Sequence, residues 1–235
     1  MSFNFKLFDI DKEQINSVNA DKDKVLYLVK RNRDSIIYNI AALENSPYTY
    51  VEVKTLLEGI TVGGHRLEDQ QLILNQDEAW KHLLKCVNAK RITIDKDFFC
   101  ELHALVAFKE ALTWGEFRTG QVSIAGTDWT PPPADQLNEI YHDGALDILL
   151  MDYPILQAIN FFLMGALNQF FFDGNKRTSR LLASGILLLN GYPALDIPAS
   201  KQLEFNNLMI QFYNTQDGQP IGQFLFDLIK GLANQ

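Results

Sequence analysis

This sequence of 235 residues contains few cysteines, no long apolar run and fewer basic than acidic residues. The only two cysteines, Cys86 and Cys100, lie in apolar surroundings, so we expect buried free thiols in a reducing compartment. Asn160 and Asn168 interrupt the longest apolar stretch, which is therefore too short for a membrane span of about 18 residues or more. A formal net charge of −8 argues against broad nucleic-acid binding.

The composition is that of an ordinary globular protein. Hydrophobic residues make up 47% of the chain and charged residues 21%, which is enough to build a sizeable core. The length predicts one domain, or one domain with an elaborated N-terminal part. Residues 1–6 lack a basic segment followed by an apolar one, so we expect no signal peptide and a cytoplasmic location.

Apolar residues recur at helical spacing through most of the chain, which predicts a mostly α-helical fold. Residues 115–126 differ, because β-branched residues alternate there between glycines, and we expect a small β-hairpin. Pro131-Pro132-Pro133 follows and favours extended backbone. The predicted helices cover residues 23–44, 67–87, 134–141, 154–170, 180–190, 201–213 and 221–232, and a further helix, capped by Thr93-Ile94-Asp95, carries the apolar residues from Phe98 to Val106.

One polar stretch, residues 169–180, has residue types suited to chemistry. It comprises Gln169, Phe170, Phe171, Phe172, Asp173, Gly174, Asn175, Lys176, Arg177, Thr178, Ser179 and Arg180. A short loop before an apolar helix exposes unpaired N–H groups to an anion. Arg177 and Arg180 are about one helical turn apart and can reach the same phosphate, while Asp173 can hold a Mg²⁺. The pattern therefore indicates a magnesium-bound polyphosphate.

The same stretch resembles the signature of the Fic/Doc (Fido) family, His-x-Phe-x-Asp/Glu-Gly-Asn-Gly/Lys-Arg-x-x-Arg. The matching positions are Phe171, Asp173, Gly174, Asn175, Lys176, Arg177 and Arg180. The resemblance implies a mostly helical Fido fold with a hairpin flap, and it covers residues from about 95 to 232. It also implies binding of ATP with Mg²⁺, in which Gly174, Asn175, Lys176, Arg177 and Arg180 contact the nucleotide and Asp173 the metal.

In this register Gln169 stands where the family has its catalytic histidine. That histidine takes the proton of a target hydroxyl, whereas an amide does not titrate near neutral pH. Losing a positioned base typically costs about 10²–10⁴ in rate. The four histidines, His65, His82, His103 and His142, all lie far upstream, and for His103 and His142 we expect structural rather than catalytic positions.

Two further parts of the chain resemble family elements. Thr55-Leu56-Leu57-Glu58-Gly59 is similar to an inhibitory helix, in which Glu58 would pair with Arg180, although Thr55 lies one residue too late for the pattern. We accordingly divide the chain into an N-terminal helical region, 1–92, and a Fic core, 93–235. Residues Val122, Ser123 and Ile124 belong to the hairpin flap, on which family members dock a protein target by strand addition.

The resemblance implies transfer of AMP from ATP to a hydroxyl of a protein target, with Gln169, Asp173 and Arg177 as the catalytic residues. Gln169 would attenuate or alter this activity. Two alternatives remain open: an inactive domain that binds nucleotide or peptide, and a Doc-like phosphotransferase, which Lys176 favours because Doc-like members carry lysine there. We expect no nucleic-acid or membrane partner, and association between copies stays open.

Overall fold

The computed structural model describes residues 4–234, and within that range the regular structure is helical without a β-strand. An isolated bridge joins Lys6 to Asp217. The α-helices are α1 (Lys12–Asn16), α2 (Lys22–Arg31), α3 (Arg33–Leu43), α4 (Tyr50–Leu57), α5 (Leu67–Asn88), α6 (Lys96–Val106), α7 (Leu137–Leu149), α8 (Pro154–Asn168), α9 (Asn175–Leu189), α10 (Gln202–Thr215) and α11 (Gln219–Ala233). Two 3₁₀ turns, η1 (Ala134–Gln136) and η2 (Ala199–Lys201), precede α7 and α10.

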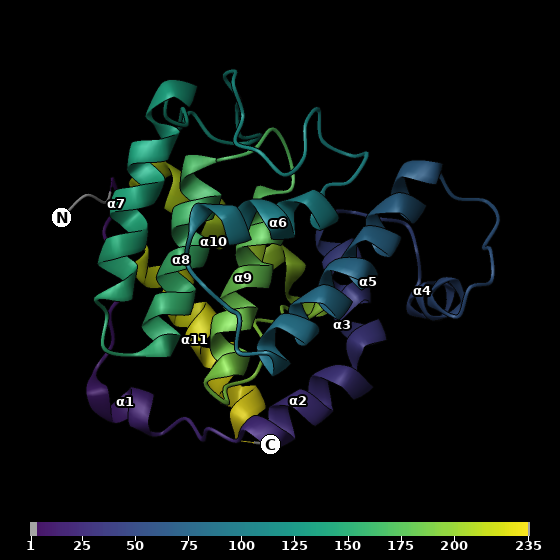
Figure 1. The fold of residues 1–235 in the computed structure, drawn as a ribbon, viewed down its shortest axis with the longest axis horizontal. Helices are drawn as coiled ribbons and strands as arrows, with labels where there is room; N and C mark the ends of the chain where they lie inside the picture. The colour runs from purple at the N-terminus through teal and green to yellow at the C-terminus, as the bar shows by residue number, and fades with distance from the viewer. Residues whose placement is uncertain (1–3, 235) are drawn as a thin grey trace.

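Helix α9 runs through the middle of the molecule, with α8 beside it and α5 and α6 across it (Figure 1). Every residue from Arg177 to Leu188 is buried; from Leu181 onward the sequence is almost entirely apolar, which accounts for the burial of that part of the helix. The N-terminal helix α2 also contacts α9. The polar stretch at the start of α9 is therefore held by the most buried helix of the fold.

Helices α8 and α9 approach each other closely because α8 has a glycine at the contact. A Cβ added to Gly165 would meet the Ser179 hydroxyl at 1.9 Å and the Ser179 Cβ at 2.8 Å. Only a residue without a side chain fits there. This contact sets the spacing of the two helices that flank the polar loop.

Several predicted helix boundaries are wrong. Residues 23–44 form two helices, because the chain bends at Asn32 (φ −105°, ψ 18°), which ends α2 and precedes α3. Helix α9 begins five residues before the predicted start at residue 180, since its first turn is polar and carries no apolar signal. Helix α7 extends to Leu149 rather than to residue 141.

The expected β-hairpin is also wrong in its detail: residues 115–133, called the flap loop below, form no strand in the described chain. The polypeptide still turns at Ala125-Gly126, where Gly126 has φ +84°. Side chains join the two arms, since Gln121 donates to the Pro131 carbonyl at 2.8 Å. The prolines opposite lack N–H groups, so they cannot donate to a strand ladder.

No helix within residues 4–234 combines the length and the apolar composition needed to cross a membrane.

Candidate functional site

The loop that joins α8 to α9, residues 169–174, is called the signature loop. It starts and ends with left-handed backbone, at Gln169 (φ 49°) and Gly174 (φ 74°). A Cβ at Gly174 would lie 3.2 Å from the Ala107 Cβ, so glycine suits both the conformation and the space. Thr178 donates both its N–H and its hydroxyl to the Gly174 carbonyl, which fixes the start of α9.

Asn175 holds the signature loop from inside. Its Oδ1 accepts from the Phe171 N–H at 2.8 Å, and its Nδ2 donates to the Phe171 carbonyl at 2.8 Å. The same Nδ2 donates to Gln169 Oε1 at 3.0 Å. Asn175 is buried and its side-chain hydrogen bonds are local, so it shapes the signature loop.

His103 packs against the signature loop although it lies far upstream in the sequence. Its Nδ1 accepts from the Gly115 N–H at 3.0 Å, so the proton resides on Nε2, which donates to the Asp173 carbonyl at 3.0 Å. The imidazole stacks on Phe171, and burial lowers the pKa of His103 to about 4. The expectation of a structural histidine is confirmed: both ring nitrogens are occupied by loop contacts.

Arg118 is fully buried and connects the flap loop to the signature loop. Its guanidinium donates to four carbonyl oxygens: Nε to Gln169 at 2.6 Å, one terminal nitrogen to Gly120 at 2.7 Å, and the other to Pro132 at 2.5 Å and Asn168 at 3.5 Å. Its backbone N–H donates to the Phe170 carbonyl at 2.9 Å. The two loops are therefore fixed to each other by a buried cation that no motif had singled out.

Arg177 is buried in an acidic surrounding. Its NH1 lies 2.7 Å from Glu110 Oε2, and its NH2 lies 3.6 Å from Asp173 Oδ1. Asn75 of α5 donates to the other Glu110 oxygen at 2.6 Å. Burial lowers the pKa of Arg177, but the carboxylates of Glu44, Glu110 and Asp173 outweigh it and raise that pKa above its ordinary value.

Arg180 is equally buried, with 5% of its surface exposed, yet its side chain has no hydrogen bond or ion pair with any residue in 4–234. Burial lowers its pKa, while the charges of Glu44 and Asp196 oppose that change. A nearly buried guanidinium without an ion pair is costly unless an anion or water joins it. This residue is the clearest sign of an anion site in the fold.

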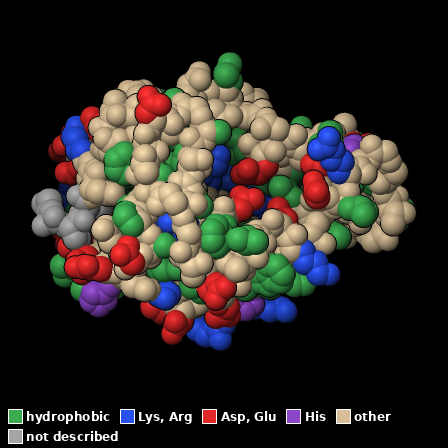
Figure 2. All heavy atoms as spheres, turned by 90° about the horizontal axis from the view of Figure 1, so that it is seen from above, with side chains coloured by type: hydrophobic (Ala, Val, Ile, Leu, Met, Phe, Trp, Pro, Cys, Tyr) green, Lys and Arg blue, Asp and Glu red, His purple; other side chains and the backbone are tan. Residues whose placement is uncertain are grey.

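A pocket of about 150 Å³ lies at the start of α9. In Figure 2, basic and acidic side chains meet in a hollow near the middle of the face that carries these loops. The first turn of α9 adds N–H groups without a partner in the helix. The residues that line the pocket are Glu44, Ser123, Gln169, Phe172, Asp173, Gly174, Asn175, Lys176 and Arg177.

Glu44 was missed in the sequence, and Glu58 does not lie where the resemblance predicts. Glu58 is the exposed C-cap of α4 and has no contact with Arg180 among the described residues. Helix α4 projects to one side of the molecule beyond α5 (Figure 1). Glu44, at the C-cap of α3, lines the pocket and acts electrostatically on both Arg177 and Arg180.

Asp173 suits a divalent cation. Its side chain is 63% exposed, and its Oδ1 accepts from the Gly174 N–H and faces Arg177. Its Oδ2 has no hydrogen bond with another described residue, which leaves one carboxylate oxygen for Mg²⁺. Lys176 lines the same pocket and is half-buried.

Gln169 points its amide into a fixed network. Nε2 donates to the Ala166 carbonyl at 2.6 Å, while Oε1 accepts from Asn175. Ser123 of the flap loop lines the pocket together with Gln169. Val122 and Ile124, on either side of Ser123, are half-buried. The segment 122–124 is therefore the part of the flap loop next to the pocket.

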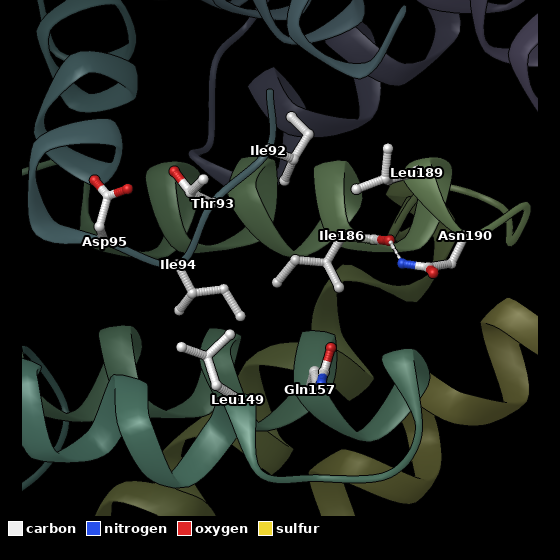
Figure 3. A pocket seen from close by; sticks show the side chains of 9 residues that line it. All are labelled: Ile92, Thr93, Ile94, Asp95, Leu149, Gln157, Ile186, Leu189 and Asn190. Carbon is white, nitrogen blue, oxygen red and sulfur yellow. Dashed lines mark hydrogen bonds between the residues drawn. The ribbon is translucent and has the colours of Figure 1, made fainter. Parts of the chain in front are cut away.

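Another cavity, of about 370 Å³, opens near the other end of α9 (Figure 3). Its lining side chains include Ile92, Ile94, Leu149 and Ile186, and no lysine or arginine. The single carboxylate there, Asp95, already accepts the Phe98 N–H as the cap of α6. This apolar cavity offers nothing that would attract phosphate.

Comparison with known proteins connects this site to one family. Residues 93–187 match the model of the Fic/DOC family. The chain is 30% identical over 199 residues to a protein adenylyltransferase Fic of Drosophila willistoni, and this match covers 81% of the chain but 39% of that relative. Another such adenylyltransferase, from Nematostella vectensis, is 26% identical, and 55% of its length is covered. The chain thus spans about half the length of these relatives or less.

Solved structures share the fold. A Fic family protein of Desulfovibrio desulfuricans G20 superposes with a TM-score of 0.77 at 19% identity, covering 97% of this chain and 75% of that one. A structure of IbpAFic2 tethered covalently to Cdc42 superposes with a TM-score of 0.57 at 13% identity, covering 95% and 68%. The expected all-α Fido fold is confirmed.

Proposed function

We propose, because residues 93–187 form a Fic/DOC-family domain, that the chain binds ATP with Mg²⁺ at the start of α9 and transfers AMP to a hydroxyl of a protein target. The relatives named adenylyltransferases support the reaction, and the geometry of the pocket supports the substrate.

One observation carries the proposal: Arg180 is buried without a partner in the described chain, one turn along α9 from Arg177. Although Arg177 is paired with Glu110, two guanidinium groups in the first two turns of a helix favour a polyphosphate, since the N-terminal amides and the positive charges attract the same anion. Asp173, with its free Oδ2, would hold the Mg²⁺, which when bound neutralises phosphate charge.

The transfer step requires the oxygen of the target hydroxyl to bond to the α-phosphorus while the bond from that phosphorus to the β-phosphate oxygen breaks. Pyrophosphate leaves, and the hydroxyl proton passes to solvent or to a phosphate oxygen, because the amide of Gln169 cannot take it. The Oε1 of Gln169 has a second lone pair that can accept the hydroxyl hydrogen bond and orient the attack. Phosphoryl-type transfer depends mainly on positioning and charge, so slow activity survives.

We place the target segment beside Val122, Ser123 and Ile124, at the edge of the flap loop that lines the pocket. Arg118 fixes this loop relative to Gln169 through the Gln169 carbonyl. A docked chain that pairs with the flap backbone would bring its hydroxyl next to Gln169.

The inhibitory role that the sequence suggested for Glu58 belongs in this proposal to Glu44. Glu44 places a negative charge in the pocket and interacts with both signature arginines. That charge competes with the phosphates for Arg180 and repels them from the pocket, so it lowers affinity for ATP.

The direct test is intact-mass spectrometry after incubation with ATP and Mg²⁺, using the Glu44→Gly protein and the Glu44→Gly/Gln169→His protein. An AMP mass that appears on the protein or an added target, and appears faster in the variant that also carries Gln169→His, supports the proposal. A phosphate mass would instead identify a Doc-like phosphotransferase.

The hydrogen bonds of the Gln169 amide favour a second function. Its Nε2 already donates to Ala166, and its Oε1 already accepts from Asn175. An inactive domain that binds nucleotide and a peptide segment needs no base. In that case both variants bind ATP, and neither transfers AMP to any protein.

A further inference from the structure

Outside the pocket, His82, Cys86 and Glu101 bring an imidazole, a thiol and a carboxylate together where α5 meets α6. His82 and Cys86 are four residues apart and lie on one face of α5, with His82 Nε2 3.4 Å from Cys86 Sγ. Glu101 reaches across from α6, with Oε1 2.7 Å from the same nitrogen. All three atoms lie within 4.8 Å of one another.

The spacing of these atoms is close to what a tetrahedral zinc ion needs. With Zn–N and Zn–O bonds of about 2.0 Å and a Zn–S bond of about 2.3 Å, neighbouring ligand atoms stand roughly 3.3–3.6 Å apart. The His82–Cys86 distance already meets this, and the His82–Glu101 distance must lengthen by about 0.6 Å. The Glu101 side chain is 42% exposed, so it can shift that far.

The cluster already holds a cation. The NH2 of Arg91 lies 2.9 Å from Glu101 Oε1 and 3.4 Å from Cys86 Sγ. The Arg91 side chain is 60% exposed, which lets it move into solvent when another cation takes its place. Cys86 itself is 3% exposed, and the partly exposed His82 and Glu101 side chains form the approach.

We propose that His82, Cys86 and Glu101 form a zinc site that clamps α5 to α6, with water as the fourth ligand. The mixture of nitrogen, sulfur and carboxylate ligands suits Zn²⁺ and is wrong for Mg²⁺ or Ca²⁺, which prefer oxygen. The site does not depend on the nucleotide pocket.

The test uses Co²⁺ as a spectroscopic substitute for zinc on the purified full chain. A thiolate ligand gives a near-ultraviolet charge-transfer band, which reports ligation by sulfur and not mere surface binding. We expect the band in the wild type and in Cys100→Ser, because Cys100 is the other buried thiol and lies outside the cluster. We expect its loss in Cys86→Ser and a strong decrease in His82→Ala and Glu101→Gln.

Zn²⁺ should displace Co²⁺ and abolish the band, and Zn²⁺ should raise the unfolding temperature of the wild type but not that of Cys86→Ser. Arg91→Ala, which removes the competing cation, should tighten Zn²⁺ binding at least threefold. A missing band in the wild type, or a band that survives in Cys86→Ser, overturns the proposal. Equal loss in Cys86→Ser and Cys100→Ser, with both folded by circular dichroism, also overturns it.

Discussion

Replacing Arg118 with methionine tests whether one buried cation fixes the two loops that border the pocket. Methionine keeps much of the volume and removes every donor of the guanidinium. The carbonyls of Gln169, Gly120 and Pro132 then lose partners that now lie 2.5–2.7 Å away. The backbone bond from residue 118 to Phe170 remains, since it does not involve the side chain.

The magnitude follows from these contacts. A hydrogen bond to a charged group contributes about 1.5–3 kcal/mol, and an unsatisfied buried acceptor costs about 1–3 kcal/mol. Two effects reduce the sum. Water can hydrogen-bond to the half-buried carbonyls, and the free-energy cost of burying the guanidinium charge is removed together with that charge. We expect Arg118→Met to lower the free energy of unfolding by about 3–5 kcal/mol, which is large for one substitution.

Urea unfolding measures this loss, and hydrogen exchange of the amides in residues 115–133 and 169–174 locates it. Both loops should lose protection more than α10 does. Arg66→Met is the matched control, because Arg66 is exposed and its side chain has no hydrogen bond or ion pair with another described residue; its effect should stay within about 0.5 kcal/mol. A loss below about 1 kcal/mol for Arg118→Met would refute the assigned role.

Three further predictions concern the surroundings of the pocket. Glu110→Gln removes the charge paired with Arg177 and should lower the free energy of unfolding by about 1–3 kcal/mol; an unchanged urea midpoint would contradict this. Gly165→Ala forces a Cβ onto Ser179, so we expect a loss of about 1–3 kcal/mol by thermal unfolding, and a stable variant would show that the helices can separate at no cost. The pKa of His103 is about 4 in the fold against about 6.5 when unfolded, so the contribution of the neutral imidazole to the free energy of unfolding is complete above pH 6.5 and falls by roughly 3 kcal/mol towards pH 4. His103→Gln should flatten the pH dependence of the free energy of unfolding in that window. Equal slopes for wild type and variant would count against this role of His103.

The helical fold was readable from the sequence where apolar periodicity was strong. The core of α9 and the whole of α8 follow from it, because both helices are apolar on most sides. Boundaries failed where no apolar signal exists, as at the polar first turn of α9. The flap loop failed for another reason: its arms are joined by side chains of Arg118 and Gln121, and such long-range contacts leave no periodic pattern.

The site was partly predictable in the same way. Arg177, Arg180 and Asp173 could be predicted from the sequence because they lie within one short motif. Glu44 and Glu110 reach the site from other helices and loops, and only the fold brings them there. The signal for Glu44 in the sequence was its position directly after the apolar residues 33–43 and before Asn45. In the structure α3 ends there, with Glu44 as its C-cap and Asn45 in a positive-φ conformation. The division of the chain at residue 93 stays a prediction.

We propose that the start of α9 is a polyphosphate site that Glu44 restrains and Arg180 completes. Isothermal titration of ATP with Mg²⁺ into four proteins tests it without any target: wild type, Glu44→Gly, Glu58→Gly, and Glu44→Gly combined with Arg180→Met. We predict tighter binding in Glu44→Gly than in the wild type, no change in Glu58→Gly, and a large loss in the double variant. Equal affinities for Glu44→Gly and Glu58→Gly, or a double variant that binds as tightly as Glu44→Gly, would contradict the account.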